Sequence, residues 1–146
     1  MTVGCRFFLS VLFLCLGGMA VTQTFAQVQV SSDEPSKDIR VTLLGTASGP
    51  RAFVDKAGIS TLVEAGGERL LFDAGRGFMQ RLVQAGFPMN AVTKLFLTHL
   101  HSDHIIGVPD LMLTPWSAAP ERKVPLDVWG PDGTGDMMCH LEAASQ

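Results

Sequence analysis

Three of the four histidines in this chain lie within six residues of one another, together with an aspartate. They are His99, His101 and His104, and the aspartate is Asp103. Imidazole and carboxylate groups are ligands that bind zinc in proteins. His99 and His101 could share one metal ion, while Asp103 and His104 could reach a second. The alternative is a polar loop that is rich in histidine by chance. The pattern therefore predicts a metal site in residues 99–104.

A short apolar segment comes directly before these residues and should hold them in place. Residues 93–97 are predicted to form a buried strand, and Asp103 is predicted to cap a short helix that ends near residue 113. A loop at the end of a rigid strand can direct several ligands into one cleft. We therefore expect the metal site at the carboxyl end of this strand.

The rest of the chain predicts an α/β layered domain. Glycines 66 and 67 indicate the turn of a hairpin. Residues 76–85 have a helical pattern with Phe78, Met79, Leu82 and Val83 on one stripe. Antiparallel hairpins come first and are followed by strands that alternate with helices, an order typical of such domains. Further strands are predicted at 39–44, 60–65, 69–73 and 124–129, a last helix at 134–144 and a proline-containing loop at 114–123.

The amino-terminal segment is predicted to be a secretory signal peptide over residues 1–26. Arg6 is followed by an apolar run over residues 7–16, and small residues precede a cleavage site after Ala26. An uncleaved membrane anchor is the alternative, but the run is short for a span of about 20 residues. Residues 27–38 are polar and are interpreted as a flexible leader. We expect a periplasmic or secreted protein with no stable membrane anchor after cleavage.

Composition limits the classes of function. The chain is 47% hydrophobic and 17% charged, which is typical of a globular protein rather than a disordered one. Loss of residues 1–26 removes one positive charge, so the formal net charge changes from −3 to −4. An acidic balance gives no general support for nucleic-acid binding. The mature chain would keep only Cys139, so it could form no internal disulfide.

The run LTHLHSDH at residues 97–104 resembles the signature of the metallo-β-lactamase superfamily. The segments LGT, LVEAGGERLLFDAG, RGFMQRL and VWGP occur here in the same order as in its ribonuclease Z and arylsulfatase-like branch. The resemblance covers residues 39–146. It implies an α/β metallo-β-lactamase fold, an αββα sandwich, of which we expect this chain to hold only the amino-terminal half.

The resemblance also implies roles for individual residues. His99 and His101 would bind a first Zn²⁺, and Asp103 and His104 a second, giving two zinc ions in a complete site. Asp103 would also act in catalysis as a proton acceptor. Asp73 would lie behind the site and orient a ligand histidine; the alternative is an aspartate that caps a turn at the end of a strand. The implied reaction is hydrolysis of a phosphodiester or sulfate ester by a metal-bound hydroxide.

Part of the family's site has no match in this chain. A third histidine, a bridging aspartate and a last histidine come from the second half of the fold in the family. His140, next to Cys139, is interpreted as a residue on the face of the last helix. A catalytically inactive, truncated metal-binding fragment is therefore the main alternative to an enzyme. A lactonase or β-lactamase also stays open.

Partners follow from the same observations. The export signal, and the lack of a match to the tRNA-binding arm, favour a small-molecule ester as substrate. They make nucleic acid unlikely, although the family leaves it open. A homodimer is a further option, but two copies of one half would not supply the missing aspartate.

Overall fold

The computed structural model describes residues 38–118 and 121–145. The predicted signal peptide and all but the last residue of the predicted leader lie outside the described residues. Within the described part, no helix combines the length and the apolar character needed to cross a membrane.

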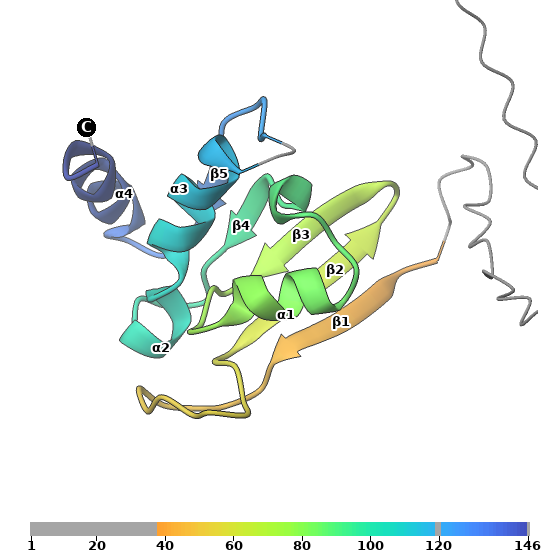
Figure 1. Cartoon of the computed structure of the whole chain (residues 1–146). Coiled ribbons are helices and arrows are strands. Elements are labelled where there is room, and N and C mark those ends of the chain that lie inside the picture. Colours follow the sequence, from red (N-terminus) through yellow and green to blue (C-terminus); the bar gives the residue numbers. More distant parts are fainter. Residues whose placement is uncertain (1–37, 119–120, 146) are drawn as a thin grey trace, which may run out of the picture. The chain divides into compact units, whose positions relative to one another are not determined.

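A single five-stranded sheet, in the order β1-β2-β3-β4-β5, organises the described residues (Figure 1). β1, β2 and β3 are antiparallel, whereas β3, β4 and β5 are parallel. Gly66 and Gly67 both have positive φ, as a two-residue hairpin turn between β2 and β3 requires. The predicted hairpin and the mixed α/β class are therefore confirmed. The strands are β1 Arg40–Gly45, β2 Ser60–Ala65, β3 Glu68–Phe72, β4 Lys94–Phe96 and β5 Asp127–Trp129.

Helices connect the parallel strands and bury one face of the sheet. α1 lies between β3 and β4, and α2 and α3 lie between β4 and β5, because parallel neighbours need such crossovers. Leu62, Leu71 and Leu95 from the sheet are fully buried in one cluster with Phe78 and Leu111 from the helices. The helices are α1 Phe78–Gln84, a 3-10 turn Met89–Ala91, α2 Ser102–Ile105, α3 Val108–Ser117 and α4 Thr134–Ala143.

The predicted apolar stripe of α1 is largely confirmed. Phe78, Met79 and Leu82 are buried against the sheet. Val83 was predicted to lie on the same stripe, but it is half exposed. At about 100° per residue, Val83 lies about 90° around the helix from the centre of the stripe that Phe78, Met79 and Leu82 form, so it falls at the edge of that stripe.

The opposite face of the sheet carries an aromatic ladder. Phe72, Phe96 and Trp129 lie side by side on β3, β4 and β5, with ring centroids 5.2 and 4.7 Å apart. On β1 of the same face, Val41 and Leu43 remain exposed. The described residues thus form one sheet with one helix-covered face, which is half of the predicted sandwich.

The helix predicted from Asp103 to about residue 113 is two helices. α2 is capped by His101 rather than Asp103, and α3 begins after Gly107. The N–H of Gly107 donates to the carbonyl of Ala74 at 2.8 Å, which ties the chain to the end of β3. A side chain at Gly107 would collide with the ring of Phe78, so the break requires glycine.

The loop predicted at residues 114–123 is also partly wrong, because α3 continues through Ser117 with Pro115 inside it. Proline lacks the N–H that would bond the carbonyl of Leu111. Arg122 donates from Nη1 to that carbonyl at 2.9 Å and from Nη2 to the carbonyl of Met112 at 2.9 Å. Burial lowers the pKa of the Arg122 guanidinium. A buried arginine therefore replaces the missing backbone donor, which a composition pattern does not reveal.

Leu71→Ala should destabilise the fold far more than the same substitution at Leu43. Leu71 is 0% exposed and Leu43 is 65% exposed, although both lie in the sheet. We expect a loss of about 2–5 kcal/mol for Leu71→Ala and at most about 0.5 kcal/mol for Leu43→Ala. Urea unfolding followed by far-UV circular dichroism measures both. Equal losses would contradict the assignment of the buried face.

Candidate metal centre

Asp73 occupies the point where β3 ends and the polypeptide turns towards α1. It is buried, and its φ of +59° is the only positive value among the described non-glycine residues. Aspartate is one of the few residues that tolerate this left-handed conformation. Its N–H donates to the carbonyl of Phe96 at 2.9 Å, so the backbone is held against β4. Such a conformation persists only where the surroundings fix it.

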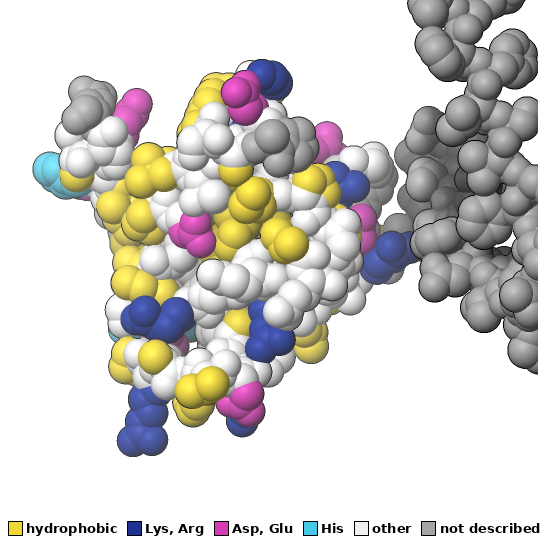
Figure 2. All heavy atoms as spheres, viewed as in Figure 1, with side chains coloured by type: hydrophobic (Ala, Val, Ile, Leu, Met, Phe, Trp, Pro, Cys, Tyr) yellow, Lys and Arg dark blue, Asp and Glu magenta, His cyan; other side chains and the backbone are white. Residues whose placement is uncertain are grey.

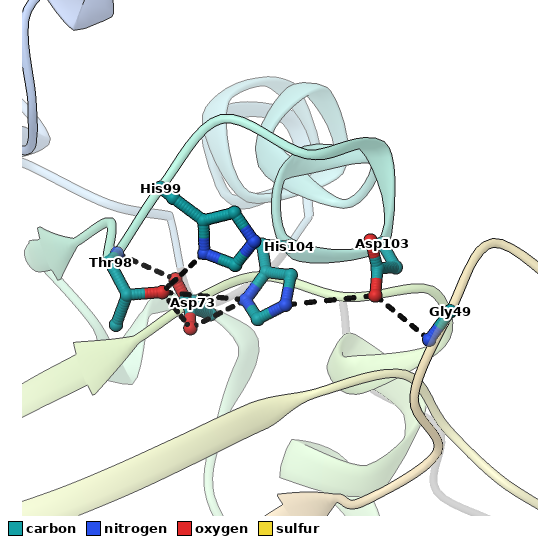
Figure 3. A network of polar contacts seen from close by, with 6 residues as sticks. All are labelled: Gly49, Asp73, Thr98, His99, Asp103 and His104. Carbon is teal, nitrogen blue, oxygen red and sulfur yellow. Dashed lines mark hydrogen bonds and ion pairs between the residues drawn. The ribbon is translucent and has the colours of Figure 1, made fainter.

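The carboxylate of Asp73 contacts both ends of the predicted metal loop (Figure 3). Oδ1 accepts from the backbone N–H of Thr98 at 2.8 Å. Oδ2 lies 2.8 Å from the Thr98 hydroxyl and 2.8 Å from Nδ1 of His104. Thr98 precedes the histidines, and His104 is the last of them. One buried carboxylate therefore fixes the beginning and the end of the loop.

This contact determines which ring nitrogen of His104 is available. A carboxylate only accepts, so Nδ1 of His104 must carry the hydrogen in this bond. Nε2 of a neutral ring then presents a lone pair, and it lies 3.6 Å from Oδ2 of Asp103. The structure thus shows Asp73 in contact with His104, one of the candidate ligand histidines.

Thr98 extends the same logic to His99. Its one hydroxyl hydrogen is directed to Asp73, so Oγ1 can accept from Nδ1 of His99 at 3.0 Å. Nε2 of His99 is then also left with a lone pair. Thr98 was not among the candidate site residues that the sequence indicated. The signal that could have revealed it is a hydroxyl residue directly before the first histidine of the motif.

Asp103 is held by the segment that follows β1. Its Oδ2 accepts from the N–H of Gly49 at 2.9 Å, a second contact that the sequence did not predict. Partial burial opposes ionisation, but the backbone N–H groups of Asp103 and Gly49, and then the charges of His104 and His101, hold the pKa of Asp103 below its usual value. The carboxylate is thereby kept in the form that binds a cation.

The four predicted ligands lie in one cluster. The ring of His99 is 3.9 Å from that of His104 and 4.6 Å from that of His101, measured between centroids. His104 is buried, whereas His101 is exposed. Cys139 and His140 are both exposed on α4, as expected for residues on a helix face.

The donor atoms fit a metal ion only in part. Two ligands of one tetrahedral zinc ion, with bonds of about 2.1 Å, lie about 3.4 Å apart, and Nε2 of His104 and Oδ2 of Asp103 are 3.6 Å apart. Among the described residues, however, no three His, Cys, Asp or Glu side chains are arranged to hold a metal ion together. The pair Asp103–His104 thus has the donor types and spacing of half a site.

Comparison with known proteins agrees with this geometry. A family model described as "Anti-Pycsar protein Apyc1" matches residues 39–128, which include β1 to β4 and the whole histidine cluster. The chain belongs to this family. Its curated relatives include ribonuclease Z from Mycobacterium sp. (strain KMS), 47% identical over 106 residues, and ribonuclease Z from Mycobacterium avium (strain 104), 46% identical over 101 residues.

These matches cover 73% and 68% of this chain but only 37% and 36% of the two relatives. The chain thus spans little more than a third of their length.

Solved structures show the same fold and confirm the resemblance to the metallo-β-lactamase superfamily. The short form of human tRNase Z has a TM-score of 0.61 and 30% identity, covering 72% of this chain and 39% of that one. The metallo-β-lactamase fold protein YhfI from Bacillus subtilis has a TM-score of 0.58 and 24% identity, covering 70% of this chain and 41% of that one. The family's ribonuclease Z-like branch is therefore the one that this chain matches.

Asp73→Asn should change the ring tautomer of His104 and weaken zinc binding. Asparagine tolerates the same left-handed backbone, but its amide can present a donor to Nδ1, which favours a hydrogen on Nε2 instead. Loss of such a carboxylate contact typically weakens metal affinity about 10–100-fold. Nitrogen-15 NMR of the His104 ring reports the tautomer, and a competition assay with a chelating dye reports zinc affinity.

Asp132→Asn is the control, because it removes the same charge from an exposed loop. An unchanged His104 tautomer in Asp73→Asn would show that Asp73 does not orient this ring.

Proposed function

We propose that this chain carries the metal-binding part of a zinc-dependent phosphodiester hydrolase. The observation that carries the proposal is the line of contacts from Asp73 through the ring of His104 to Asp103. A buried carboxylate that fixes a histidine, whose free nitrogen points at a second carboxylate, is a typical arrangement for a metal ligand. A structural histidine would need no such partner on its second nitrogen.

Each residue of the cluster has a distinct task in this proposal. Asp103 and His104 would hold one zinc ion, and His99 and His101 would contribute to a second. Bound zinc would supply Lewis-acid chemistry, polarising the ester and making water a better nucleophile. Asp103, whose pKa is lowered, stays ionised and would be the proton acceptor beside the reacting group. Asp73 and Thr98 keep the two rings turned so that each offers Nε2.

The names of the relatives support RNA, or another phosphodiester, as the substrate. Ribonuclease Z and tRNase Z are named for action on RNA, and they match most of the described residues. The sequence alone favoured a small-molecule phosphodiester or sulfate ester and made nucleic acid unlikely. A relative named ribonuclease Z, 47% identical over this region, favours a phosphodiester over a sulfate ester and supports nucleic acid as a substrate. Export by residues 1–26 is a separate proposal, which would place the reaction outside the cytoplasm.

Replacement of His104, which belongs to the histidine cluster, should strongly reduce activity, whereas replacement of His140 should not. We expect zinc-loaded protein to hydrolyse bis(p-nitrophenyl) phosphate and His104→Ala to lose on the order of 100-fold or more in rate. His140→Ala is the matched control, because His140 is exposed on α4 and outside the cluster. Release of p-nitrophenol measures all three proteins, with and without a chelator.

Two results would count against the proposal. Equal rates with and without the chelator would exclude a metal-dependent reaction. Zinc binding that is lost in His104→Ala, without any hydrolysis by the unmodified chain, would favour the metal-binding fragment without catalysis.

A further inference from the structure

We propose that Arg51 and Arg76 form an anion subsite that binds a phosphoryl group of the substrate beside Asp103. The choice of a phosphodiester substrate rests on the proposed function. The subsite itself rests on a cavity, on the state of the two guanidinium groups and on the backbone contacts that place them.

A small cavity of about 70 Å³ opens next to the metal cluster. Its lining includes Arg51, Arg76, Ser102 and Asp103, which come from three separate segments of the chain. A site needs roughly 10–15 Å³ of accessible volume to hold one water molecule, so this cavity can hold a small group of several heavy atoms. A phosphoryl group is a group of that kind.

Arg51 and Arg76 differ from the other described cations in having no partner. Among the residues that the structure describes, neither guanidinium makes a hydrogen bond, an ion pair or a ring contact. The remaining cations each have one, to a carboxylate, a carbonyl, an amide oxygen or an aromatic ring: Arg40, Lys56, Arg69, Arg81, Lys94, Arg122 and Lys123. Both unpaired cations, Arg51 and Arg76, line the same cavity as Asp103, the proposed catalytic carboxylate.

Backbone contacts fix the main-chain positions of Arg51 and Arg76. The bond from Gly49 N–H to Asp103 Oδ2 holds the segment that carries Arg51 against the cluster. The carbonyl of Arg76 accepts from the N–H of Gly58 at 2.8 Å, and a Cβ atom at Gly58 would lie only 2.7 Å from the nitrogen of Arg76. This approach requires glycine and anchors Arg76 at the edge of the cavity.

The charge pattern of the surface agrees with this placement. Figure 2 shows dark-blue Lys and Arg side chains gathered on the lower part of the viewed face, where the connection between β1 and β2 and the ends of α1 and α2 lie in Figure 1. The chain as a whole is acidic, with a formal net charge of −3. A local cationic surface on an acidic protein can attract an anionic substrate to one place.

Arginine is suited to a phosphodiester group. Its planar fork of N–H donors matches two phosphate oxygens at once and stays charged at any physiological pH. Two such forks, with the Ser102 hydroxyl nearby, could contact both non-bridging oxygens and leave the ester bond directed towards Asp103. Arg51 and Arg76 are then substrate-positioning residues, and a neutral ester would gain nothing from them.

Binding of inorganic phosphate to zinc-loaded protein tests the subsite without any need for activity. We expect Arg51→Gln and Arg76→Gln each to raise the dissociation constant for phosphate about 10-fold, because loss of one charged hydrogen bond typically changes affinity by about that factor. Arg76→Lys should recover only part of the loss, since it keeps the charge but not the fork. Zinc content should stay the same in all of these variants.

Arg40→Gln is the matched control, because Arg40 is an exposed arginine on β1 that forms a 3.7 Å ion pair with Glu64. Its phosphate affinity should stay within about 2-fold of the unmodified protein. Unchanged binding in the Arg51→Gln/Arg76→Gln double variant would overturn the subsite, and so would an equal loss in Arg40→Gln.

Hydrolysis adds a second, separate measurement. For bis(p-nitrophenyl) phosphate we expect KM to rise about 10-fold in each variant, whereas KM for the neutral ester p-nitrophenyl acetate should not change. An unchanged KM for the phosphodiester, combined with weaker phosphate binding, would show a site for free phosphate and overturn the substrate role. If no protein hydrolyses the phosphodiester, the proposed function fails, while the phosphate dissociation constants still decide whether the subsite exists.

Discussion

The hydrogen bonds of one buried carboxylate hold the candidate site together. Asp73 accepts from the backbone and hydroxyl of Thr98 and from the ring of His104, and its own N–H bonds to β4. A charged group that is almost fully buried requires this number of donors. The same donors leave the metal loop with one arrangement. The left-handed backbone at Asp73 turns the chain at the end of β3 and lets the same residue hold both the metal loop and β4.

Local patterns were sufficient to predict the sheet strands, the hairpin turn and the short segment in which three histidines lie together. Those features depend on neighbours in sequence: alternation of apolar residues, two consecutive glycines, and histidines within one short segment. The break at Gly107 and the helical continuation through Pro115 were not predictable in this way. The first depends on contact with Phe78, and the second on a donor from Arg122, so both are decided by residues distant in sequence.

Within the site, too, the residue types are set by a short sequence segment, whereas their contacts are set by residues distant in sequence. The motif indicated candidate ligands, but the hydrogen bond from Gly49 to Asp103 joins residues 54 positions apart. The choice of nitrogen on His99 and His104 depends on Thr98 and Asp73, which no spacing rule connects. The position of Arg76 beside the cavity likewise results from the close approach of two backbone segments. Sequence thus indicated which chemistry to expect, and packing determines its orientation.

The aromatic ladder gives the chain an intrinsic optical probe. The ring of Trp129 stacks on Phe96, and its carbonyl accepts from the N–H of Leu97 at 2.7 Å, one residue before the loop that Asp73 anchors. Indole emission depends on nearby packing and on exposure to water. Ordering of the histidine loop would therefore alter the emission of Trp129, because this hydrogen bond joins Trp129 to the residue directly before that loop.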